Sequence, residues 1–161
     1  MSAIISECDN YRYLLTRPGD MHAVQGTALF LMLNPSTADA TEDDPTIRRC
    51  RNFARTWSCN GIAVANLYAL RATDPAELWK HPDPVGPDND WRLKSIAREY
   101  PDIVCAWGAN ARSDRVTAVA SILTAAGGRL WCLGTTKDGH PRHPLYVRGD
   151  QPLIPWTLPG A

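Results

Sequence analysis

Four short, mainly apolar runs constrain the fold of this chain more than any other feature. They cover residues 27–33, 62–68, 102–107 and 129–134, and each has the length of a β-strand. Continuous apolar strands are typical of a parallel sheet that is buried on both faces. Because parallel strands need long crossover connections, the segments between the runs should supply helices that cover the sheet.

Helical periodicity is present between these runs. Asp44 can cap a helix that has Pro45 at its first position, and apolar residues then recur at helical spacing as far as Trp57. Two further helices are predicted over 90–99 and 114–126. The alternation of strands and helices predicts an α/β fold, a short parallel central sheet flanked by helices in three layers.

Strands are also predicted outside the alternating part. We expect 11–16 to form an N-terminal hairpin with 27–33, through a turn in the segment RPGD, and 151–156 to add an edge strand. The length of 161 residues suits one domain over 1–161.

Composition excludes several classes of protein. No apolar run approaches the roughly 20 residues that cross a bilayer, and the first residues lack the layout of a signal peptide. We therefore expect a cytoplasmic protein without a membrane partner. The five cysteines form no Cys-x-x-Cys pair, so neither a zinc ribbon nor an iron–sulfur framework is indicated, and Cys105 and Cys132 should be reduced core residues.

The carboxyl ends of the predicted parallel strands should share one cleft, where ligands bind in sheets of this kind. The segments that follow the strands are polar or rich in glycine and proline, and they are 34–39, 66–74, 107–112 and 134–144.

Two asparagines follow strands directly. Asn34, fixed by Pro35, could orient a water or a ligand, although Asn-Pro is also a common turn. Asn66 offers a donor and an acceptor that could read the edge of a base, or it could be a satisfied loop residue.

Charged residues gather near 39–44 and on the helix that follows. The carboxylates of 39–44 could bind Mg²⁺ or act as acid and base, but capping of the helix is the favoured interpretation for Asp44. Arg48, Arg51 and Arg55 share one helix face and could contact phosphates, although a solvated face is commoner. The net charge of zero argues against a strongly basic nucleic-acid binder.

Two of the four histidines lie in the segment HPRHPLYVR, where a proline follows each. His140 and His143 have no cysteine or glutamate at ligand spacing, so we predict no metal. Two rigid imidazoles beside Arg142 suit acid–base or electrostatic roles better.

Long motifs resemble an uncharacterised bacterial domain family. These motifs are LNPSTADA, DDPTIRRC, NLYALRATDP, PVGPDND and PRHPLY. More distantly, LNPS, NLYALRATDP, PDIVCAWGANA and HPLYVR resemble, in this order, motifs of the uracil-DNA glycosylase superfamily. That resemblance implies a short parallel sheet between helices, an active site at the strand ends, and hydrolysis of a base–sugar bond without a metal or cofactor.

The second resemblance also implies roles for individual residues. Asn34 would position the attacking water, Asn66 would bind the base edge, and His143 would stabilise negative charge on the departing base. His140 is the rival for that last role, since it also precedes a proline. A target base in a duplex would be flipped into the pocket.

Further contacts complete the expected site. Substrate contacts are expected from Pro35, Ser36, Asp39, Asp44, Thr46, Arg71, Gly108 and Arg142. Nucleic-acid contacts are expected from Arg48, Arg51, Arg55 and Arg148. Thr46 or Ile47 stands where relatives place an aromatic residue on the base, so the substrate could be DNA, a nucleotide or a nucleoside.

Three hypotheses follow from the sequence. The first is a DNA or nucleotide N-glycosylase that acts on a damaged or modified base. The second is a non-catalytic binding module for nucleobases or nucleic acid with the same fold. The third is a Mg²⁺-dependent hydrolase that uses the 39–44 carboxylates, which EDTA would inhibit.

Overall fold

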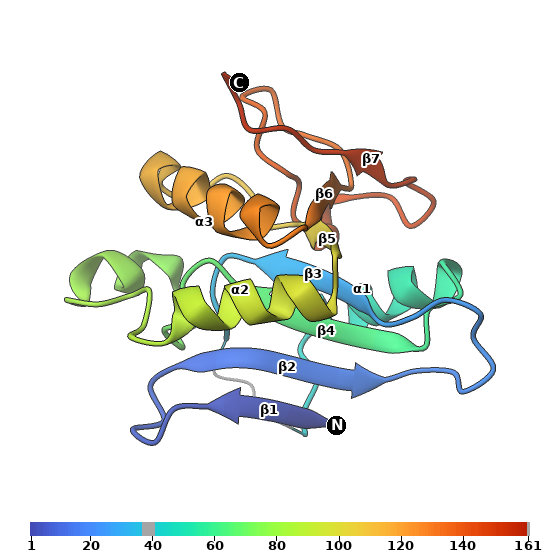
Figure 1. Ribbon diagram of the computed structural model, residues 1–161, viewed down its shortest axis with the longest axis horizontal. Coiled ribbons are helices and arrows are strands. Elements are labelled where there is room, and N and C mark those ends of the chain that lie inside the picture. The colour runs from blue at the N-terminus through green and yellow to red at the C-terminus, as the bar shows by residue number, and fades with distance from the viewer. Residues whose placement is uncertain (37–40, 161) are drawn as a thin grey trace.

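The computed structural model describes residues 1–36 and 41–160, and the strands in this part form one mixed sheet (Figure 1). Its strand order is β1-β2-β4-β3-β5-β6-β7. The strands are β1 (Ser2–Ile5), β2 (Arg12–Pro18), β3 (Ala28–Met32), β4 (Gly61–Asn66), β5 (Asp102–Cys105), β6 (Arg129–Cys132) and β7 (Ile154–Pro155).

The sheet combines a parallel centre with antiparallel edges. Strands β4, β3, β5 and β6 run parallel, in the register Phe30↔Val64 and Phe30↔Val104 around β3. Strand β2 joins β4 antiparallel, and β7 joins β6 antiparallel. This arrangement confirms the α/β class and the parallel centre, whereas the complete sheet is mixed.

Helices cover both faces of the sheet. They are α1 (Pro45–Thr56), α2 (Asn89–Glu99) and α3 (Ser113–Ala125), with short 3-10 helices η1 (Pro75–Lys80) and η2 (Pro144–Tyr146). Side chains of a strand alternate between faces. Accordingly, Leu29 and Leu31 of β3 join the core under α2 and α3, whereas Phe30 and Met32 pack in the core under α1.

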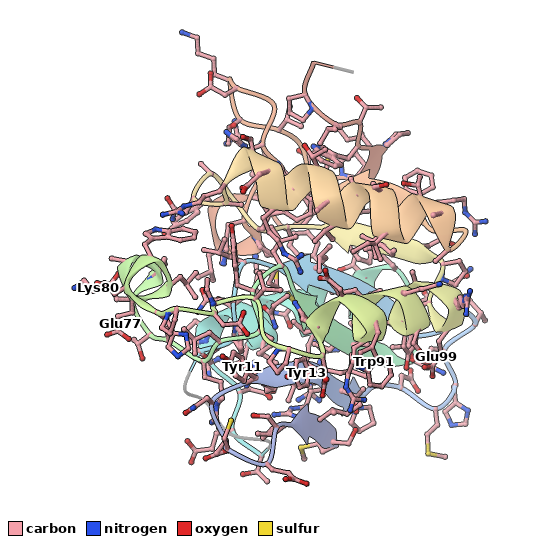
Figure 2. All side chains as sticks on the ribbon, turned by 60° about the vertical axis from the view of Figure 1, so that its left-hand side comes forward. Tyr11, Tyr13, Glu77, Lys80, Trp91 and Glu99 are labelled. Carbon is pink, nitrogen blue, oxygen red and sulfur yellow. The ribbon has the colours of Figure 1, made fainter. Side chains whose placement is uncertain are left out.

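Strand β2 extends the core beneath α2. Figure 2 shows Tyr13 beside that helix, and the guanidinium of Arg92 lies 5.4 Å from the centre of the Tyr13 ring. Tyr11, just before β2, donates from its hydroxyl to the carbonyl of Asp83 (2.8 Å) in the loop that precedes α2. Cys105 and Cys132 are buried with free thiols, as expected. No helix in the described ranges is long and apolar enough to span a membrane.

One predicted pairing is wrong. The hairpin expected between 11–16 and 27–33 does not form, because β4 lies between β2 and β3 and pairs with both. The hairpin at the N-terminus instead joins β2 to β1, which the sequence did not indicate. Every residue of β3 is buried. A central position in the sheet, where both faces are covered, therefore stabilises β3 more than an outer position would.

Candidate functional site

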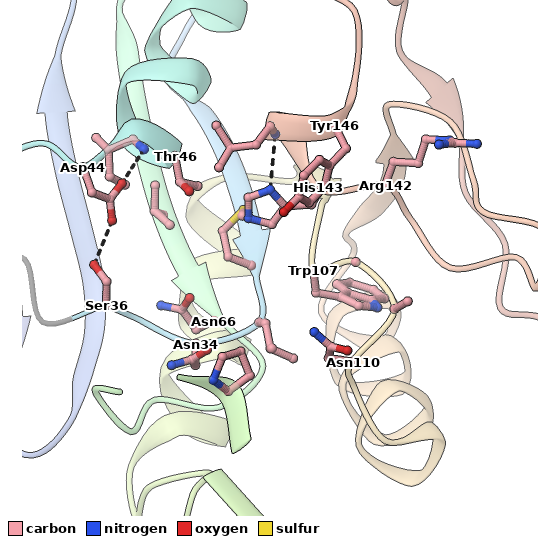
Figure 3. A pocket seen from close by; sticks show the side chains of 18 of the residues that line it. Asn34, Ser36, Asp44, Thr46, Asn66, Trp107, Asn110, Arg142, His143 and Tyr146 are labelled. Atoms are coloured by element: carbon pink, nitrogen blue, oxygen red, sulfur yellow. Dashed lines mark hydrogen bonds between the residues drawn. The ribbon is translucent and has the colours of Figure 1, made fainter. Parts of the chain in front are cut away.

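The carboxyl ends of the parallel strands enclose a cavity of about 500 Å³ (Figure 3). Residues from all four segments that follow the strands line it. Among the residues singled out from sequence, the cavity brings together Asn34, Ser36, Asp44, Thr46, Asn66, Gly108, Arg142 and His143.

Asn34 is held by the backbone around it. Its Nδ2 donates to the carbonyl of Pro35 (3.1 Å) and to that of Ala72 (2.9 Å). Because both partners are acceptors, they fix which end of the amide carries the hydrogens. The amide oxygen of Asn34 is therefore the atom left to accept a hydrogen bond from a water or a ligand.

Asn66 ends β4 and is 1% exposed. Neither its Nδ2 nor its Oδ1 has a hydrogen-bond partner in the described part of the chain. A buried polar group left in this way costs about 1–3 kcal/mol of stability. A ligand with one donor and one acceptor on the same edge would satisfy both atoms.

The position of Asn66 is fixed from behind by another buried asparagine. Asn89, at the start of α2, donates from Nδ2 to the carbonyls of Asn66 and Leu67, each at 3.1 Å. These bonds hold the end of β4 against the helix.

His143 caps η2, where its Nδ1 accepts a hydrogen bond from the backbone N–H of Leu145 (3.2 Å). This contact places the proton of the neutral ring on Nε2. Burial lowers the pKa of His143, and the negative charge of Asp44 offsets part of that effect. At neutral pH the residue is thus an uncharged hydrogen-bond donor.

Backbone hydrogen bonds hold the loop that carries His143 to the loop after β5 and to its own first residues after β6. The N–H of Gly108 donates to the carbonyl of Pro141 (2.9 Å), and that of Arg142 donates to the carbonyl of Gly134 (3.0 Å). Gly108 has φ +78°, a conformation that side chains disfavour.

His140 lies in the same loop, but it does not line the cavity. Its N–H donates to Oγ1 of Thr136 (3.2 Å), and its carbonyl accepts from the N–H of Thr136 (2.8 Å). The cavity therefore distinguishes between the two histidine-proline steps, since His143 lines it and His140 does not.

Asp44 caps α1, as predicted. Its Oδ1 accepts from the N–H of Ile47 (2.8 Å), and its Oδ2 accepts from Oγ of Ser36 (2.8 Å). Asp39 lies outside the described residues. Within the described ranges, no group of three histidine, cysteine, aspartate or glutamate side chains could hold a metal ion.

The remaining predicted contacts lie outside the cavity lining. Arg51 pairs with Asp43 (2.7 Å), Arg71 with Asp9 (2.9 Å) and Arg148 with Asp150 (3.1 Å). The other residues that the cavity does not include are Pro35, Arg48 and Arg55.

Sequence reasoning missed several lining residues, of which Arg12, Trp107 and Tyr146 are the most informative. Arg12 is buried, and burial lowers its pKa to about 10, with the charge of Arg71 adding to the effect, so it stays cationic at neutral pH. Trp107 precedes Gly108 at the end of an apolar run, a position that could have revealed it. Nothing in the sequence around Arg12 marks it.

The comparisons with known proteins identify a family but no activity. Neither the search of curated proteins nor that of solved structures gave a significant match. Residues 12–145 match the family described as protein of unknown function, DUF1643. Because the match spans most of the sequence, the chain belongs to the DUF1643 family.

Proposed function

We propose that this protein hydrolyses the bond between a damaged or modified base and its sugar, in DNA or in a nucleotide. The observation that carries the proposal is the amide of Asn66, which is buried in the cavity wall and whose two polar atoms have no partner among residues 1–36 and 41–160. A side-chain amide of this kind matches the paired donor and acceptor on the edge of a base.

The neighbouring groups suit the charges that develop when this bond breaks. The base leaves with the electron pair of the C–N bond, while positive charge grows on the sugar. The Nε2–H of His143 donates a hydrogen bond to the departing base, and the oxygen of Asn34 orients the water whose oxygen bonds to the sugar carbon. That water releases a proton to solvent, and the base anion is then protonated.

The fold and the mouth of the cavity support the proposal at a coarser level. A mixed sheet whose parallel centre has the cavity at its carboxyl edge suits the arrangement that the resemblance to uracil-DNA glycosylases implies. Tyr146, on η2 beside His143, is 79% exposed at the cavity and offers an aromatic surface for contact with nucleic acid.

A second candidate, a binding module without catalysis, is favoured by one observation. Asp44 is the sole carboxylate among the described lining residues, and both of its oxygens already accept hydrogen bonds. No described carboxylate in the cavity is therefore placed to take the proton of an attacking water. A site of this kind would bind a base and release no product.

Base release detected by mass spectrometry separates these functions. The substrates are DNA with normal, deaminated or modified bases, and the matching nucleotides and nucleosides, each with and without EDTA. We expect one base to be released with EDTA harmless, and we expect His143→Ala to abolish release while His140→Ala retains it. Binding without release would favour the binding module, and inhibition by EDTA would contradict the proposed mechanism.

A further inference from the structure

A second buried group in the cavity wall has no hydrogen-bond partner within the ranges that the structure describes. Trp107 follows β5 and is 3% exposed, and its indole Nε1–H has no hydrogen-bond acceptor in the described part of the chain. In the view of Figure 3, Trp107 and Asn110 lie on the opposite side of the cavity from Asn34 and Asn66. Leaving an indole donor buried and unbonded carries the same kind of cost as for Asn66.

Trp156 provides an internal comparison. Its ring packs edge-on against the ring of Trp107, with the centroids 5.1 Å apart and the planes at 84°. However, the Nε1–H of Trp156 donates to the carbonyl of Gly139 (3.1 Å), and Trp156 is not part of the cavity lining. Two adjacent, buried indoles thus differ in whether the protein satisfies their donor.

We infer that the indole N–H of Trp107 binds an acceptor atom of the ligand, which makes Trp107 a specificity-determining residue. This inference rests on the proposed function for the identity of the ligand as a base. Asn66, Trp107 and His143 then present donors to the ligand, the buried cation of Arg12 adds positive charge, and the amide oxygens of Asn34 and Asn66 are the acceptors. An excess of donors selects a ligand rich in acceptors, such as ring carbonyl oxygens.

The indole N–H resonances of the whole protein in ¹⁵N-labelled form test the inference directly. Trp107→Phe and Trp156→Phe each remove one resonance and so assign it, while both keep an aromatic ring. The probes are free uracil, hypoxanthine, cytosine and adenine at millimolar concentration. In the protein alone, we expect the N–H of Trp107 to exchange with solvent faster than that of Trp156.

With a bound base, we expect the Trp107 resonance to shift and its exchange to slow, while that of Trp156 changes little. Trp107→Phe should weaken binding of that base roughly tenfold, whereas Trp156→Phe should not. Equal exchange of the two N–H groups without ligand, or no response of Trp107 to any probe, would overturn the inference.

The role of Trp107 and the proposed catalysis can fail independently of each other. Binding that depends on Trp107 without base release supports the inference and contradicts catalysis. Base release that Trp107→Phe leaves unchanged supports catalysis and contradicts the inference.

Discussion

Two buried polar regions flank the start of α1, and they differ in how fully the protein satisfies them. Beside α1, the side chain of Arg17 is fully buried, and its Nε donates to Oδ1 of Asp43 (2.7 Å), while Arg51 binds Oδ2. In the cavity, by contrast, the amide of Asn66 and the indole of Trp107 are buried without hydrogen-bond partners among the described residues. The first region stabilises the fold, whereas the second lowers stability, a cost that the ligand of the proposed function would offset.

The largest expected change in the free energy of unfolding comes from the region with the ion pairs of Asp43. Asp43→Ala removes the carboxylate that neutralises a buried guanidinium, so it should lower the free energy of unfolding by about 3 kcal/mol in urea denaturation. Asp150→Ala breaks the exposed pair with Arg148 and should leave stability close to wild type. Equal effects of the two variants would contradict the structural role of Asp43.

Acid should weaken the same region. Burial raises the pKa of Asp43, but hydrogen bonds from Arg17 and Arg51 outweigh this and hold it below the usual 3.8. Because the folded-state pKa is depressed, the contribution of Asp43 is present above pH 3.8 and is lost as the pH falls through the lower value. Urea denaturation across this range should show the loss in wild type and not in Asp43→Ala.

Base release at the cavity should respond to acid at a higher pH than the ion pair of Asp43 does. Burial lowers the pKa of His143 below its usual 6.5, and protonation of Nδ1 would break the contact with Leu145. Base release should therefore be level above pH 6.5 and fall by about tenfold per unit below the lowered pKa. His143→Gln should lack this acid limb, and a limb that persists in the variant would assign the titration elsewhere.

The lowered pKa of His143 also affects the stability of the folded protein. The unfolded chain binds a proton at His143 before the folded chain does, so the free energy of unfolding should decrease as the pH falls from 6.5 towards the lowered pKa. Denaturation of wild type and His143→Gln over this interval measures the difference. Identical pH dependence in the two proteins would contradict the burial of this imidazole.

A smaller effect of opposite sign is expected at Asn66. Asn66→Leu replaces two unsatisfied polar atoms with an apolar side chain of similar size, so the free energy of unfolding should rise by about 1 kcal/mol. Urea denaturation tests this against Asn89→Leu, which removes two hydrogen bonds from the side chain to backbone carbonyls and should destabilise the protein. A loss of stability in Asn66→Leu would show that this amide has a partner within the protein.

The smallest effect is expected at the other histidine-proline step. The hydrogen bonds of His140 with Thr136 are made by its backbone, and its side chain does not line the cavity. His140→Ala should therefore change the free energy of unfolding by less than about 0.5 kcal/mol. If His140→Ala reduced base release as much as His143→Ala does, the proposed difference in role between the two histidines would be wrong.

Sequence patterns predicted those parts of the fold that depend on local periodicity. Helix α1 begins at Pro45 with Asp44 as its cap, because proline and a short acceptor side chain are favoured at these positions. The pairing of β2 with β4 was not predictable in this way, since strand order depends on contacts between segments distant in sequence.

The candidate site was also predictable only where local sequence patterns mark its residues. Asn34 and Asn66 were recognisable because they follow apolar runs. His140 and His143 could not be separated, since each precedes a proline and only the folded loop turns one of them towards the cavity. The missing partners of Asn66 and Trp107 depend on every neighbouring segment, so no local pattern could reveal them.

The most direct test of the account is base release by the wild-type protein and Asn66→Leu, measured by mass spectrometry over the same panel of DNA, nucleotides and nucleosides. We predict that the wild type releases one base and that the variant, although folded and at least as stable, loses at least about 100-fold of this rate. Release at the wild-type rate by Asn66→Leu would contradict the claim that the unsatisfied amide reads the substrate.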